Sequence, residues 1–159
     1  MVLEQDNSRA SQSGSEADSS RIPGEPVESE PVSCEQWKEQ AGQWSSRGFF
    51  QTPRWVEILC EAFAEFENSS VILYGHDGSK VLLPLVKNRK APGLYTWLSL
   101  PYGTYGGPIP AEGDDSLHWP LVQAYLSNNL FSAFNLTLPP GATAPSGAAK
   151  PSARALITQ

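Results

Sequence analysis

The sequence predicts an α/β domain. Apolar residues recur with the helical period of 3.6 over residues 52–66, and two short apolar runs bounded by turn residues follow at 71–74 and 81–86. Composition changes at Ser33 and again after Leu138, which leaves about 106 residues for one ordinary hydrophobic core. Residues 33–138 are therefore expected to form the folded part of the chain.

The two ends differ from this central part in composition. Residues 1–32 hold seven acidic and two basic side chains but few large apolar ones, so they predict a disordered acidic tail. Residues 139–153 are rich in Pro, Gly, Ala and Ser, as flexible connectors are. Residues 154–159 read as the opening of a strand. Residues 139–159 are thus expected to be a connector and the start of a missing second half of a longer protein.

Charge and cysteine content exclude several classes of function. The formal net charge is -6, and the nearest approach to a basic cluster is Lys87, Arg89 and Lys90 between two expected strands, which favours a solvated turn over a phosphate site. We expect no DNA partner. No stretch approaches the roughly 18 apolar residues of a membrane span, and no leader pattern is present. The sequence predicts a cytoplasmic protein without a membrane span, with Cys34 and Cys60 reduced and no metal site.

Two helices are expected early in the folded part. Residues 33–36 have the Ser-x-x-Gln pattern of a capping box, which predicts a short helix that ends near Gly48. In the second helix, Thr52 is expected to be the N-cap and Pro53 the first helical residue. Its apolar stripe continues to Phe66, so the helix is expected to reach that residue.

The remaining elements alternate between strands and one helix. Asp77-Gly78 predicts the turn of a hairpin, and Pro84, which cannot donate a backbone hydrogen bond, requires an edge, a bulge or a strand end. Residues 94–100 predict a third strand. A helix is expected from about His118, and the alternation over 131–138 predicts a half-buried strand.

The segment after the third strand has the composition of a ligand-binding turn. It contains two tyrosines and three glycines between Pro101 and Pro108, which fix φ at both ends. Glycines allow positive φ and a close approach of the backbone to another molecule. A tight connection whose tyrosines pack on the core is the alternative reading. The candidate binding residues are Tyr102, Gly103, Thr104, Tyr105, Gly106 and Gly107.

Three segments together resemble a known family. Residues 49–55 (FFQTPRW), the hairpin with Leu83-Pro-Leu-Val-Lys87, and residues 99–108 (SLPYGTYGGP), in that order, resemble the N-terminal half of FemAB-like acyltransferases of the GNAT superfamily. The resemblance covers roughly residues 35–138. It implies that residues 33–138 are the first of two GNAT-like halves, incomplete alone, with a mixed, largely antiparallel sheet and flanking helices.

The resemblance also implies a function. The complete enzyme would transfer an acetyl, acyl or aminoacyl group to an amine of a cell-envelope precursor, such as a peptidoglycan-precursor-like or other small-molecule acceptor. Its donor would be acyl-CoA or aminoacyl-tRNA, which this chain alone is not expected to bind, because it has no glycine-rich pyrophosphate loop before a helix. The C-terminal GNAT half would come in cis or in trans, and without it this half would be inactive and leave a large apolar surface bare.

Transferred residue by residue, the resemblance assigns residues 102–107 to the acceptor side of the cleft and a packing role to Phe50 and Trp55. It transfers no catalytic acid or base. His76 is expected in a hairpin turn and His118 at a helix start, neither in a catalytic role. Two alternatives to the enzyme half remain: a non-catalytic binding module, and a degenerate remnant of such an enzyme.

Overall fold

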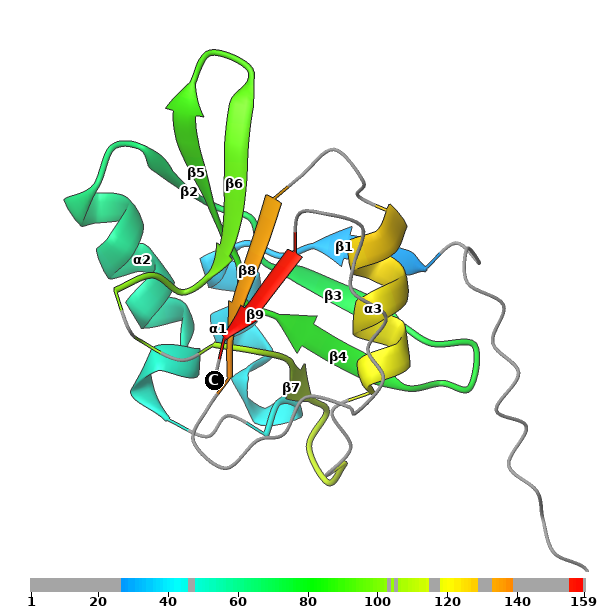
Figure 1. Ribbon diagram of the computed structural model, residues 1–159. Coiled ribbons are helices and arrows are strands. Elements are labelled where there is room, and N and C mark those ends of the chain that lie inside the picture. Colours follow the sequence, from blue (N-terminus) through cyan, green and yellow to red (C-terminus); the bar gives the residue numbers. More distant parts are fainter. Residues whose placement is uncertain are drawn as a thin grey trace, which may run out of the picture.

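Figure 1 shows the computed structural model of the chain. The structure describes residues 27–45, 48–102, 104, 106–114, 118–128, 133–138 and the backbone of 155–158. The expected tail up to residue 26 and the expected connector at 139–153 lie outside the described residues.

Helices and strands alternate along the chain. Their bounds are β1 (Glu28–Pro31), α1 (Cys34–Glu39), two 3-10 turns (Ala41–Gln43 and Phe49–Gln51), α2 (Pro53–Ala62), β2 (Phe66–Asn68), β3 (Val71–Tyr74), β4 (Lys80–Leu83), β5 (Val86–Ala91), β6 (Leu94–Ser99), β7 (Ile109–Pro110), α3 (Trp119–Asn128), β8 (Ala133–Thr137) and β9 (Ala155–Thr158).

The strands form two sheets. One has the order β1-β3-β4-β7 and is antiparallel throughout. The other has the order β2-β5-β6-β8-β9, in which β6–β8 and β8–β9 are parallel and the other pairs antiparallel. The expected α/β class is confirmed, with antiparallel and mixed pairing and few helices.

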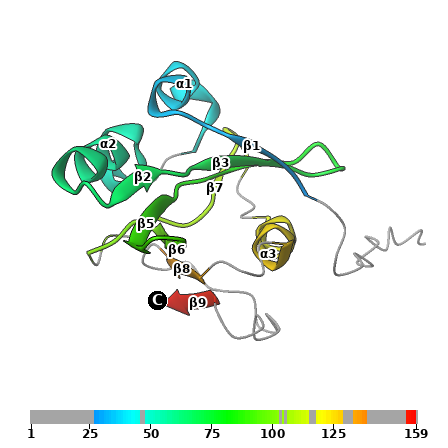
Figure 2. The same ribbon diagram turned by 90° about the horizontal axis from the view of Figure 1, so that it is seen from above.

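Helices cover both faces of the first sheet. In Figure 2, α1 and α2 lie on one side of β3 and α3 lies on the other. Side chains alternate accordingly along the strands, because successive residues of a strand face opposite sides. Ile72 and Leu82 join the cluster with Trp37 and Leu59. Leu73, Val81 and Leu83 join a second cluster, which also contains Leu121 and Val122 of α3.

Helix α1 starts where the sequence predicts and ends earlier. The Ser33 Oγ accepts from the Gln36 backbone N–H, and the Gln36 side chain accepts from the Ser33 N–H, so the capping box is confirmed. The predicted end near Gly48 is wrong, since the helix stops at Glu39. Buried Trp44 has an extended backbone and forms a β-bridge with Ala111. Pairing with this distant segment, and not the helical pattern, therefore determines the conformation at Trp44.

Helix α2 starts at the predicted position, but Thr52 caps no helical N–H with its side chain, because its hydroxyl donates to the Phe49 carbonyl at 2.6 Å. Pro53 occupies the first turn, as expected. Phe66 was expected to close the helical stripe, but it begins β2 and pairs with Asn88 of β5. Its backbone N–H donates to the Phe63 carbonyl in a tight turn. Strand pairing therefore overrides the helical period over these last residues.

Two further expectations are corrected by strand pairing. Residues 28–31, placed in the disordered tail by composition, form β1 against β3, where the Tyr74 hydroxyl also donates to Glu30 at 2.9 Å. The basic residues 87–90, expected in a turn, lie within β5. By contrast, Pro84 falls between β4 and β5, which satisfies its requirement for a strand end.

The other expected elements are confirmed. The described residues include the hairpin β3–β4, the strands β6 and β8, and α3 just after His118. β9 is the strand expected over residues 154–159, and it pairs with β8. No helix among the described residues is long and apolar enough to cross a membrane.

Candidate functional site

The segment after β6 has an unusual backbone. Leu100 and Tyr102 have φ of 66° and 65°, a left-handed conformation that non-glycine residues seldom adopt. Such a conformation costs about 1–3 kcal/mol and persists only where surrounding structure imposes it, often at functional sites. Leu100 is buried, which fixes one end of the segment. The Thr104 hydroxyl, donating to the Pro101 carbonyl at 2.8 Å, closes the turn.

Gly106 attaches the other end of the segment to the sheet. Its N–H donates to the Thr137 carbonyl at 2.9 Å, and the Thr137 N–H donates to the Ser99 Oγ at 2.9 Å. A Cβ at position 106 would lie 2.8 Å from the Ser99 carbonyl oxygen. Glycine is therefore required for this close contact with the end of β6. Gly107 follows with φ of 77°, which also favours glycine.

Gln51 joins the first family-like segment to the third. Its side chain is buried, with 2% exposed, and its Nε2 donates to the Gly106 carbonyl at 2.8 Å. Phe50 and Trp55 pack on each other, with ring centroids 5.2 Å apart, and against the core cluster that contains Trp37 and Leu59, so the expected packing role of these aromatics is confirmed. Two segments 55 residues apart thus form one unit.

Tyr102 is exposed on this fixed backbone. Its side chain is 63% exposed, and its ring lies 5.1 Å from that of Phe63 and 6.2 Å from that of Phe66. Phe66 is buried and supports the Tyr102 ring from within the core, so we call the side chains of Tyr102 and Phe63 the Tyr102 surface. Glu61 and Glu65, both exposed, flank Phe63 in the sequence. The Glu61 carboxylate pairs with Arg54 at 3.6 Å, so the attraction of this surface for a cation comes from its aromatic faces.

The predicted site residues take different places. Tyr102 reaches solvent, whereas Thr104, Gly106 and Gly107 are buried and shape the segment. Gly103 and Tyr105 lie outside the described residues. Sequence reasoning missed Gln51 as a support and assigned Phe63 and Phe66 only to a helical stripe. The signal for Gln51 was its place in the FFQTPRW segment.

Other titratable groups lie elsewhere. His118 Nε2 lies 2.5 Å from the Asp114 carboxylate just before α3, a partner that the sequence reasoning did not identify. His76 lies in the β3–β4 turn, as expected. Burial raises the pKa of the Cys34 thiol to about 11 and also raises that of Cys60, which makes both poor nucleophiles near neutral pH. The described residues contain no metal-ligand cluster.

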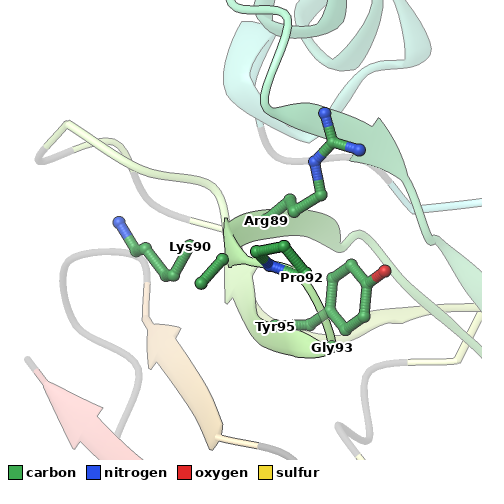
Figure 3. Close-up of a pocket in the computed structure, with 6 residues that line it drawn as sticks. Arg89, Lys90, Pro92, Gly93 and Tyr95 are labelled. Atoms are coloured by element: carbon green, nitrogen blue, oxygen red, sulfur yellow. The ribbon is translucent and has the colours of Figure 1, made fainter.

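A hollow lies at the β5–β6 hairpin. Its lining is formed by residues 89–93 and Tyr95 (Figure 3). The sequence did not predict this hollow, because it indicated the glycine-rich segment after β6 as the candidate site. Exposed large hydrophobic side chains are few in the part of the chain described here: Phe49, Leu94 and Tyr102. The large bare apolar surface expected of an isolated half does not occur among these residues.

Comparisons with known proteins give no relatives. No family model matches the chain, and neither a curated protein nor a solved structure matches it.

Proposed function

We propose that this chain is the acceptor-side half of a FemAB-like N-acyltransferase of GNAT type, in which the Tyr102 surface receives the amine-bearing acceptor. The observation that carries the proposal is the exposed phenol of Tyr102 on a backbone fixed at both ends. The mixed pairing of the second sheet and the helices that cover the first sheet support the α/β class that the proposal requires. The family resemblance of residues 49–55, 83–87 and 99–108 supplies the reaction class.

The Tyr102 surface would act by positioning. Aromatic faces attract an ammonium group by about 0.5–1 kcal/mol at exposed sites, and the phenol hydroxyl adds a hydrogen bond. Held in this way, the acceptor loses rotational and translational freedom before the reaction. After losing a proton to a base or water, its nitrogen would attack the donor's carbonyl carbon. An N–C amide bond forms while the C–S bond of an acyl-CoA, or the C–O bond of an aminoacyl-tRNA, breaks and the thiol or hydroxyl leaves.

Transfer assays with mass spectrometry test this function. The chain is combined with the C-terminal half of a FemAB-like acyltransferase, an amine-bearing peptidoglycan precursor, and either acyl-CoA or aminoacyl-tRNA. We expect product only when both halves are present. Tyr102→Ala is expected to lower kcat/KM about 5- to 150-fold, because a polar contact and an aromatic face worth about 1–3 kcal/mol are lost.

The matched control is Leu94→Ala, which removes another exposed apolar side chain, on the β5–β6 hairpin. It is expected to leave transfer unchanged. Product from this chain alone would show that no second half is needed. Absence of product with either donor, while the folded chain still binds the precursor, would replace the enzyme half by the second candidate.

That second candidate is a free-standing module that binds an amine without transferring to it. The scarcity of large exposed hydrophobic side chains in the described part favours it, because an isolated half would expose its interface. The two candidates share the Tyr102 surface and differ in whether a second half is required.

A further inference from the structure

The β5–β6 hairpin projects from the described fold (Figure 1). Its strands pair in register from Val86 opposite Leu98 to Ala91 opposite Leu94, with an irregularity after Arg89. Pro92 and Gly93 form the turn, in which Gly93 has φ of 76°. Residues 89–94 are all exposed. We call residues 89–95 the hairpin tip.

Different kinds of side chain occupy the end of the hairpin and the part of its strands next to that end. The end carries apolar residues, with Leu94 59% exposed beside Pro92. Arg89 and Lys90 follow in β5, and Figure 3 shows their side chains extending in different directions. Tyr95, opposite Arg89 in the register, is half-buried. An apolar end, followed by a level that holds both cations and an amphipathic aromatic, matches the chemistry of a lipid headgroup layer.

The charge of the hairpin opposes that of the whole chain. Residues 86–99 contain three basic and no acidic side chains, whereas the chain has a formal net charge of -6. Lys87 lies 4.0 Å from the centroid of the Tyr95 ring and 3.6 Å from the Glu67 carboxylate. Among the described residues, neither Arg89 nor Lys90 forms an ion pair. Two cations beside the hollow are thus available to an anionic partner.

We propose that the hairpin tip docks on an anionic lipid surface. Leu94 and Pro92 enter the headgroup layer, Arg89 and Lys90 meet lipid phosphates, and Tyr95 lies at the interface. The association is peripheral. This inference is independent of the proposed acyl transfer, because it concerns a different surface and is tested by binding.

A nucleic acid is the less suitable partner. Phosphate binding requires the cations but gives no reason for an exposed leucine beyond them. Trp97, the next aromatic on this face, is occupied within the fold: its Nε1 donates to Ser69 at 3.0 Å and its ring lies 5.7 Å from that of Phe134. It is therefore not free to stack on bases.

Vesicle co-sedimentation tests the proposal with the whole chain. We expect binding to phosphatidylcholine vesicles containing about 30% phosphatidylglycerol, and little binding to phosphatidylcholine alone. The double variant Arg89→Gln/Lys90→Gln is expected to lower the partition coefficient about 10- to 30-fold. Leu94→Asn is expected to lower it about 5- to 10-fold through lost insertion. All substituted positions are exposed, and circular dichroism verifies folding.

The control for net charge is Lys38→Gln/Arg54→Gln, which removes two positive charges from α1 and α2, where both side chains pair with Glu57. It is expected to change the partition coefficient less than about 2-fold. If the control variant lost as much vesicle binding, net charge alone would explain the effect, and that result would overturn the proposal. So would displacement by inorganic phosphate, which indicates a free-anion site, or binding to single-stranded RNA without binding to anionic vesicles. Failure of wild-type protein to sediment with anionic vesicles overturns it directly.

Discussion

Replacing Gln51 by alanine is expected to lower the free energy of unfolding by about 3–5 kcal/mol. The side chain is buried and its Nε2 donates to the Gly106 carbonyl at 2.8 Å. Truncation leaves a cavity and removes the partner of a buried carbonyl, and each contributes to the loss. Urea unfolding followed by circular dichroism measures it.

Gln51→Met separates the two contributions. Methionine has a similar volume but cannot donate, so this variant is expected to lose about 1–3 kcal/mol. Gln43→Ala is the control, because Gln43 is exposed in the 3-10 turn after α1 and its truncation is expected to change stability by less than about 0.5 kcal/mol. Equal stabilities for all four proteins would show that Gln51 does not hold the glycine segment.

Gly106→Ala is expected to lower the free energy of unfolding by about 1–3 kcal/mol. The new Cβ would lie 2.8 Å from the Ser99 carbonyl oxygen, a backbone atom that cannot move without disturbing the end of β6. The displaced segment also weakens the hydrogen bond between the Gly106 N–H and the Thr137 carbonyl. Denaturant midpoints measure the effect.

Gly42→Ala is the matched control. Nothing lies within 4 Å of a Cβ at position 42, so the substitution is expected to be neutral or to stabilise by up to about 1 kcal/mol. Ser99→Gly in the Gly106→Ala background is expected to give no recovery, because the shortest contact is with the Ser99 backbone oxygen and because the Thr137 N–H loses the Ser99 Oγ as its partner. Recovery, or equal stability of Gly42→Ala and Gly106→Ala, would disprove the contact at Ser99.

Local signals predicted the starts of the helices well. The capping box at Ser33 and the proline at position 53 act within one turn, so the sequence alone locates them. The alternation of side chains over residues 133–137 is also a local pattern, and it predicted strand β8. The strands β1 and β2 could not be predicted, because they depend on pairing with β3 and β5.

The candidate site likewise has parts that the sequence predicted and parts that it could not predict. The glycines and tyrosines of the segment after β6 indicated a special turn, and the unusual φ angles occur there. The supports of that turn come from Gln51 and Thr137, which are far away in sequence, so no local pattern identifies them. Phe63 and Phe66 fit the helical period of the preceding residues and were therefore predicted to lie on one face of a helix.

An amine titration followed by NMR tests the central claim, that the held segment presents Tyr102 to an amine-bearing acceptor. The protein carries carbon-13 in its Tyr and Phe rings, and Tyr102→Leu assigns the Tyr102 signals. Nα-acetyl-L-lysine is expected to shift Tyr102 and Phe63 in the millimolar range, whereas the same compound acetylated at its ε-amine, which lacks the cation, is not. Shifts of equal size with both compounds, or shifts confined to other rings, would contradict the account.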